Sequence, residues 1–207
     1  MTSVREHWQN VYAAKTPEEV SWHQQTPRLS LELIARAGGG SEASVIDIGG
    51  GASTLVDHLL KAGYRDITVL DIADAALDHA RARLGADAAR VNWIVADITA
   101  RKPSRQFDIW HDRAALHFLT APAAQHAYAE ALCTALEPGG AAIIGGFAPG
   151  GRTKCSGLDV VQHDAESLSA LLGDEFALID AIDELHLTPS GAEQPFRFHL
   201  FRRRVSA

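Results

Sequence analysis

Three consecutive glycines follow an acidic residue in the stretch VIDIGGGASTLVDHLL. This stretch starts at Val45, has Asp47 inside its apolar run, and passes through Gly49, Gly50 and Gly51 into a pattern with helical spacing. In an open α/β sheet, ligands bind beyond the carboxyl ends of the strands, where glycines let the backbone approach them closely. The glycines therefore predict a ligand-binding turn between a strand and a helix.

The spacing of these glycines argues against a phosphate ligand. A dinucleotide-binding turn has the pattern G-x-G-x-x-G/A, but Thr54 occupies its last position, where a β-branched side chain fits poorly. The stretch also lacks the Gly-Lys-Ser/Thr sequence of a P-loop. Ser53 and Thr54 are candidates for the N-cap and first turn of the next helix, a role compatible with contacts to a different ligand.

Two further carboxylates stand near the ends of the next two predicted strands. Asp71 lies in DITVLDI (66–72), and Asp97 lies in RVNWIVADI (90–98). A carboxylate at the end of the second strand can accept hydrogen bonds from two ribose hydroxyls. Ile72 and Ile98 follow these acids directly and place apolar surface beside them. Asp71 and Asp97 are therefore candidate binding residues for a nucleoside.

The predicted elements that position these residues alternate between strand and helix, which is typical of a parallel sheet covered by helices on both faces. Strand-like runs alternate with helical patterns at 44–49, 53–63, 66–72, 73–85, 90–98, 107–112, 122–136 and 140–148. A glycine-rich loop at 148–157 and a short helix at 164–173 come next. The last two runs, 176–187 and 195–204, are joined by a linker short enough for a hairpin, which predicts antiparallel neighbours.

The whole chain limits the classes of protein that fit it. Its 207 residues, 46% of them hydrophobic, suit one domain, with 1–40 as an N-terminal helical segment and 41–207 as the core. A formal charge of −7 disfavours nucleic acid as a partner. No apolar run is long enough to span a membrane and no signal peptide is recognisable, so we expect a soluble, cytoplasmic protein. The oligomeric state is left open.

With the acids in place, the sequence resembles the class I S-adenosylmethionine-dependent methyltransferases. Their first motif is an apolar strand with an acid, then Gly-x-Gly and a small residue, as in Asp47, Gly49, Gly51 and Ser53. The strand FDIWHD and the run LEPGGAAIIGGF match two later motifs. The resemblance implies a Rossmann-like seven-stranded sheet, ordered 3-2-1-4-5-7-6 with the last strand antiparallel.

The resemblance also implies S-adenosylmethionine as the cofactor and assigns its contacts. Asp71 would bind the ribose, Asp97 and Ile98 the adenine, and the glycine turn the amino-acid portion. Asp47 would hold either the turn or the cofactor's ammonium group. A cofactor with a sulfonium cation and no phosphate suits a site rich in acids. No metal is expected, because Cys155 and His163 are too few for a soft-metal site.

A polar cluster follows the fourth strand, where the family's methyl acceptor enters. His111, Asp112 and His117 are the candidate catalytic residues, since a histidine near neutral pH suits removal of a proton from an acceptor. Asp112 is expected to orient a histidine or contact the cofactor, and Arg113 to pair with an acid. Burial without a catalytic role is the alternative for both histidines.

The N-terminal segment is similar to the lid of small-molecule methyltransferases of the thiopurine and tellurite-resistance type. Trp8, Tyr12 and Trp22 would then wall the cofactor site, exclude water and offer π faces to a cation. The alternative is an amphipathic helix that buries Trp8 and Tyr12 in the core. The resemblance implies a small-molecule acceptor with a nitrogen, oxygen, sulfur or metalloid atom. A protein-lysine methyltransferase, a non-catalytic S-adenosylmethionine-binding module and a nicotinamide-dependent reductase are the other hypotheses.

Overall fold

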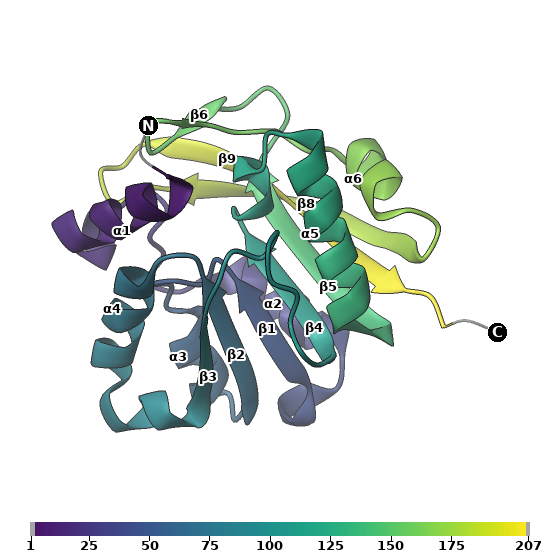
Figure 1. The fold of residues 1–207 in the computed structure, drawn as a ribbon, viewed down its shortest axis with the longest axis horizontal. Coiled ribbons are helices and arrows are strands. Elements are labelled where there is room, and N and C mark those ends of the chain that lie inside the picture. The colour runs from purple at the N-terminus through teal and green to yellow at the C-terminus, as the bar shows by residue number, and fades with distance from the viewer. Residues whose placement is uncertain (1–2, 206–207) are drawn as a thin grey trace.

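The computed structural model describes residues 3–205 and contains a seven-stranded sheet with helices on both faces (Figure 1). The sheet consists of β1 (Ser44–Ile48), β2 (Asp66–Asp71), β3 (Val91–Val95), β4 (Phe107–Arg113), β5 (Leu136–Phe147), β8 (Phe176–Leu187) and β9 (Glu193–Arg203). The α-helices are α1 (Val4–Ala14), α2 (Arg28–Ala37), α3 (Leu55–Lys61), α4 (Asp74–Leu84), α5 (Pro122–Ala135) and α6 (Ala165–Leu172).

The strand order of this sheet is β3-β2-β1-β4-β5-β9-β8. The neighbouring strands β3, β2, β1, β4 and β5 all pair in parallel. By contrast, β9 is antiparallel to both β5 and β8. With β8 and β9 counted as the sixth and seventh strands, this is the order 3-2-1-4-5-7-6. The predicted Rossmann-like fold is therefore confirmed.

Alternate side chains of the strands enter two cores, one on each face of the sheet, as the two-residue period of a strand requires. One core packs Val45 and Ile109 against α2, α3 and α4. The other packs Ile46 and Trp110 against α5 and α6. On β4, His111 and Asp112 continue this alternation and therefore face opposite sides of the sheet.

The region after β5 differs from the predicted loop. Residues 148–157 and the segment that follows contain a two-stranded ribbon of β6 (Lys154–Cys155) and β7 (Leu158–Asp159). Ser156 and Gly157 form its turn with φ values of 50° and 80°, the positive values that two-residue hairpin turns need. The β5 strand also starts at Leu136, earlier than predicted, because Leu136 pairs with Phe107 across a register shift.

Within residues 3–205, the helices are all too short or too polar to cross a lipid bilayer. In the same range, no three His, Cys, Asp or Glu side chains are grouped so that they could hold a metal ion.

Candidate functional site

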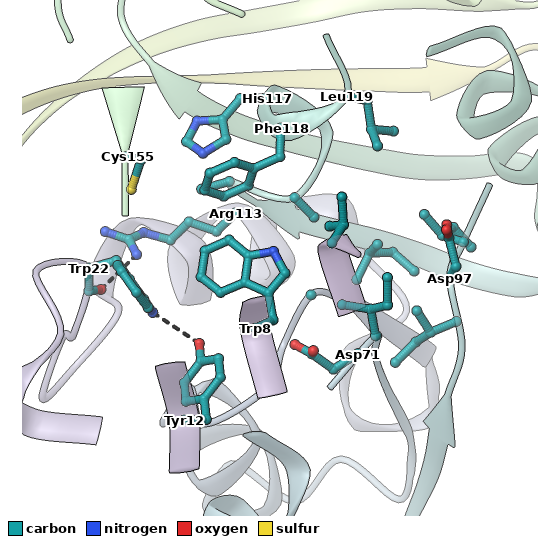
Figure 2. A pocket seen from close by; sticks show the side chains of 18 of the residues that line it. Trp8, Tyr12, Trp22, Asp71, Asp97, Arg113, His117, Phe118, Leu119 and Cys155 are labelled. Carbon is teal, nitrogen blue, oxygen red and sulfur yellow. Dashed lines mark hydrogen bonds between the residues drawn. The ribbon is translucent and has the colours of Figure 1, made fainter. Parts of the chain in front are cut away.

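The carboxyl ends of the first four strands meet at one edge of the sheet, where a cavity opens (Figure 2). The space free of protein atoms in this main cavity, its open mouth included, is about 910 Å³. Next to it lies a side cavity of about 510 Å³, lined in part by the turn between β1 and α3. Tyr12, Trp22, Gly49 and Arg113 line both cavities.

The turn after β1 has room for glycine alone at all three positions. At Gly49, whose φ is +66°, a Cβ atom would lie 2.8 Å from Ala115 Cβ. A Cβ atom at Gly50 would overlap the Asp47 carboxylate and lie 2.7 Å from Val69 Cγ1. At Gly51, whose φ is +38°, it would lie 2.7 Å from Asp71 Oδ2. The missing side chains thus let the backbone pass beside two carboxylates, and the predicted approach of this turn to a ligand stays a prediction.

Asp71 ends β2 as a buried carboxyl group that lines the main cavity. Its Oδ1 accepts a hydrogen bond from the Ala73 amide at 2.8 Å. Burial raises the pKa of Asp71 to about 7, and the nearby Asp47 carboxylate adds to this effect, while the bond from Ala73 opposes it. A ligand that donates hydrogen bonds to this carboxylate would relieve its burial. The side chain therefore fits the ribose hydroxyls of an adenosine.

Asp97 lies after β3, where the sequence places it, and also lines the main cavity. Its Oδ1 accepts hydrogen bonds from the amide and hydroxyl of Thr99 at 2.8 and 2.7 Å. Ile72 and Ile98 line the cavity beside the two acids. The main cavity thus brings together the two acids and both isoleucines that were expected to bind a nucleoside.

Asp47 lies instead in the side cavity, paired with a buried histidine. His111 Nδ1 is 2.7 Å from Asp47 Oδ1, and His111 Nε2 is 2.9 Å from the hydroxyl of Ser30 on α2. All three side chains are buried. Because both ring nitrogens are already hydrogen bonded, this geometry supports a role for His111 in orienting Asp47 rather than the expected role as a base.

Asp112 is completely buried and lines neither cavity. It accepts hydrogen bonds from the amides of Ala115 and Leu116 at 2.7 and 3.0 Å and from the Tyr128 hydroxyl at 2.7 Å. Burial raises the pKa of Asp112 to about 6, although these hydrogen bonds act in the opposite direction. Its placement does not support the expected contact with cofactor or catalytic histidine: Asp112 fixes the turn after β4.

His117 is the expected catalytic residue that the structure places in the main cavity. It is buried between the rings of Phe118 and Phe147, and neither of its ring nitrogens has a hydrogen-bond partner in residues 3–205. Burial lowers the pKa of His117 to about 3, helped by the charges of Arg113 and His163. His117 is therefore neutral at neutral pH and has a lone pair free to accept a hydrogen bond, but its lowered pKa makes it a weaker base than the near-neutral histidine expected from the sequence.

The N-terminal aromatic residues cover the main cavity. The ring centroid of Trp8 lies 4.9 Å from that of Phe118 and 5.7 Å from that of Trp22. Trp22 Nε1 donates to the hydroxyl of Tyr12 at 3.1 Å, as Figure 2 shows. All three N-terminal rings line the cavity and form a separate small cluster with alanines of the core, among them Ala76. The expected wall of Trp8, Tyr12 and Trp22 beside the site is present.

The two hydroxyl residues after the glycines, Ser53 and Thr54, differ in their position relative to the cavities. Ser53 lines the side cavity, and its hydroxyl accepts the Leu55 amide at 3.1 Å. Thr54 lines neither cavity, because its hydroxyl donates to the Gln24 carbonyl at 2.8 Å. This placement does not support a contact between Thr54 and the cofactor. The threonine fastens the segment before α2 to the start of α3.

Several lining residues were not predicted from the sequence. Arg113 was expected to pair with an acid, yet it lies in both cavities. Gln194 and Phe196 lie on β9, far along the chain, and no local sequence pattern predicts that they line the cavity. Cys155 also lines the main cavity, as a free thiol whose pKa burial raises to about 11.

Comparison with known proteins agrees with this geometry. Residues 45–140 match the family model described as a methyltransferase domain. No curated protein matches the chain.

Solved structures share the fold across nearly the whole chain. A protein studied for the conversion of a disulfide bond into a thioacetal group during echinomycin biosynthesis has a TM-score of 0.77 and 20% identity, over 99% of this chain and 95% of that chain. The 1,6-didemethyltoxoflavin-N1-methyltransferase of Burkholderia thailandensis, with bound 1,6-didemethyltoxoflavin and S-adenosylhomocysteine, has a TM-score of 0.68 and 20% identity, over 95% and 82%. A TehB-like SAM-dependent methyltransferase of Corynebacterium glutamicum has a TM-score of 0.63 and 17% identity, over 96% and 95%. The predicted resemblance is confirmed: residues 45–140 match a methyltransferase domain, and the chain has the fold of the class I S-adenosylmethionine-dependent methyltransferases.

Proposed function

We propose that the protein transfers the methyl group of S-adenosylmethionine to a small molecule through a nitrogen, oxygen, sulfur or metalloid atom. The observation that carries this proposal is the main cavity, which two strand-end acids line together under an aromatic cover. The toxoflavin-precursor enzyme with the same fold acts on a small molecule and supports this acceptor class.

Different residues of the two cavities bind different parts of the cofactor. Asp71 accepts the ribose hydroxyls, and Asp97 binds the adenine amino group beside Ile98. The amino-acid tail extends over Gly49 and Gly50 into the side cavity, where the buried Asp47 pairs with its ammonium group. In this arrangement His111 holds Asp47 in position through their 2.7 Å contact.

The acceptor side of the main cavity lies beyond this tail. Its walls are apolar and aromatic, with Phe118, Phe147 and Phe196 from three different parts of the chain. These rings and the N-terminal aromatic residues exclude water and present π faces, which attract cations such as a sulfonium. A cavity with aromatic walls under an aromatic cover favours a small acceptor over a protein lysine, which would need an open groove.

Catalysis then rests mainly on alignment. When bound, S-adenosylmethionine supplies an electrophilic methyl group whose bond to sulfur breaks as a bond to the acceptor atom forms. The cavity walls hold the acceptor in line, a contribution that can account for much of the rate acceleration. Where the acceptor carries a proton, neutral His117 receives it at a ring nitrogen.

Replacement of Asp71 by alanine is expected to weaken binding of S-adenosylhomocysteine by about 1 to 3 kcal/mol, because hydrogen bonds to a charged group are lost. Isothermal titration calorimetry on both proteins measures the difference. Replacement of Asp78, an exposed acid on α4 outside both cavities, is the matched control and should leave the affinity unchanged. An Asp71→Ala variant with wild-type affinity would remove Asp71 from the binding site.

The affinity for S-adenosylhomocysteine should also depend on pH through Asp71. Its pKa in the free protein is raised to about 7, and ribose hydroxyls bind best to the ionised form. Affinity should therefore fall as pH decreases through 7. The dissociation constant should be about tenfold larger at pH 6 than at pH 8. The Asp71→Asn variant should show weak binding without this slope, and an equal slope in that variant would assign it to another group.

The reaction is tested with methyl-labelled S-adenosylmethionine and a panel of amines, phenols, thiols and metalloid oxyanions, followed by mass spectrometric identification of labelled products. A labelled small molecule formed by the wild-type protein and not by Asp71→Ala supports the proposal. Label transferred to proteins of a cell extract would favour the lysine hypothesis. Tight cofactor binding without any labelled product would favour the non-catalytic binding module, and tighter binding of NAD(P)H than of S-adenosylhomocysteine would favour the reductase.

A further inference from the structure

Arg113 is the one arginine that lines the main and side cavities among the residues of the described chain. It is the last residue of β4, and Figure 2 shows its side chain directed toward Trp22 and Cys155, away from Asp97. This position is the junction between the space assigned to the cofactor's tail and the space assigned to the acceptor.

The guanidinium group is held in place from two sides. Its Nη1 atom donates to the Trp22 carbonyl at 2.9 Å. Its central carbon lies 4.6 Å from the ring centroid of Phe196, a cation–π distance. A planar group fixed by a hydrogen bond and a ring face loses little further freedom when it binds a ligand.

The remaining edge of the guanidinium group is unused. Both Nε and Nη2 of Arg113 are buried, and neither has a hydrogen-bond partner among residues 3–205. These two atoms lie on the same edge of the group, and their parallel N–H bonds match the two oxygens of a carboxylate. Buried donors without partners are costly, so a ligand that satisfies both gains the free energy they otherwise lose.

Acidic side chains near Arg113 do not satisfy this edge. Glu184 and Asp47 are close enough to favour the charged form, but burial is the larger effect and lowers the pKa of Arg113 to about 10. The guanidinium group is therefore still charged at neutral pH. Glu184 Oε1 accepts from Gln24 at 3.3 Å, and Glu184 Oε2 is itself a buried atom without a partner in the described chain.

We propose that the free edge of Arg113 binds a carboxylate at the junction of the two cavities. Two sources fit this chemistry: the amino-acid tail of the cofactor, whose ammonium group would then face Asp47, and an acidic acceptor molecule. The inference rests on the proposed function and goes beyond it, because it assigns the chemical group that this arginine recognises.

The first experiment compares two ligands in wild-type protein and Arg113→Gln. S-adenosylhomocysteine carries the carboxylate, whereas 5′-methylthioadenosine shares its adenosine and thioether sulfur but lacks the amino-acid tail. If the cofactor is the source, Arg113→Gln weakens binding of the first by on the order of 30-fold or more and leaves the second within about twofold. Retained binding of methylthioadenosine also shows that the variant is folded.

The second experiment tests an acidic acceptor. Wild-type protein saturated with S-adenosylhomocysteine is titrated with benzoate and with its neutral analogue benzamide, and tryptophan fluorescence reports binding, because Trp8 and Trp22 line the main cavity. If the acceptor is the source, benzoate binds at least about tenfold more tightly than benzamide, and Arg113→Gln abolishes this preference.

Two further variants separate recognition from packing. Arg113→Lys keeps the charge but lacks the two parallel N–H donors that match a carboxylate. It should therefore bind more tightly than Arg113→Gln but more weakly than the wild-type protein. Glu184→Gln removes the nearest competing acid and should preserve or strengthen carboxylate binding. A structural ion pair between Arg113 and Glu184 predicts the opposite, a similar loss in both the Arg113→Gln and Glu184→Gln variants.

The outcomes are distinct. The proposal is overturned if Arg113→Gln changes neither S-adenosylhomocysteine affinity nor the benzoate preference, or if it weakens S-adenosylhomocysteine and methylthioadenosine equally. Wild-type protein that binds neither nucleoside contradicts the proposed function itself. Wild-type binding of both nucleosides, with no effect of Arg113→Gln, contradicts this inference and leaves the proposed function in place.

Discussion

Removal of residues 1–25 is expected to lower methyl-transfer turnover by about 10²-fold or more while the sheet remains folded. The deletion removes Trp8, Tyr12 and Trp22, which line the main cavity and separate it from water. It also removes the carbonyl that holds Nη1 of Arg113. Steady-state turnover of the acceptor found in the panel, with circular dichroism on the same samples, measures both effects.

The fold should survive this deletion because the N-terminal segment stands apart from the main cores. Neither of the two large core clusters contains a residue before Leu29. The α1 helix is fastened to α4 instead, where His79 Nε2 lies 2.8 Å from the Tyr12 carbonyl and the Ala75 amide donates to Gln9 at 3.3 Å. A single substitution, Trp8→Ala, should reproduce much of the loss, whereas Lys15→Ala, on an exposed residue outside both cavities, should not. Equal loss of folding and turnover would favour the amphipathic core helix.

Replacement of His117 by glutamine is expected to lower kcat by about 10²-fold for an acceptor that must lose a proton, the low end of a general base's contribution, because the lowered pKa of His117 makes it a weak base. The affinity for S-adenosylhomocysteine should stay within about twofold, because the base acts on the acceptor. His126→Gln, on the exposed surface of α5, is the matched control. Full kcat in His117→Gln with such an acceptor would contradict this role.

The pH dependence of kcat follows from the environment of His117. Its pKa is lowered to about 3 by burial and by the charges of Arg113 and His163. A base with a lowered pKa loses activity only as pH falls toward that value, so His117 should add no step to the kcat profile near pH 6.5. A carboxylate bound to Arg113 would partly neutralise the arginine charge, which disfavours protonation of His117. The pKa of His117 would then rise from this low value.

The sequence predicts the fold and the meeting of Asp71 and Asp97 because both depend on local patterns. Strand periodicity gives the order of elements, and parallel strands bring their carboxyl ends to one edge, which puts Asp71 and Asp97 in one cavity. The glycine turn is recognisable for the same reason, since close backbone approach requires glycine at Gly50 and Gly51.

The roles of the cluster after β4 depend on partners that are distant in the sequence. Both nitrogens of His111 are occupied, one of them by Ser30 of α2, and no local pattern shows this contact. Asp112 is held by Tyr128 of α5 and by the turn that follows it. The free edge of Arg113 is likewise visible only after β9 brings Phe196 against it. Chemistry-bearing residue types mark where the site lies, whereas tertiary contacts decide which of them face a ligand.

A crystal structure of the protein with S-adenosylhomocysteine tests the central claim most directly. We expect the ribose hydroxyls within hydrogen-bond distance of Asp71, the adenine amino group at Asp97, and the thioether sulfur directed toward the His117 side of the main cavity. A nucleoside bound away from Asp71 and Asp97, or a protein that fails to bind it at millimolar concentration, would contradict the account.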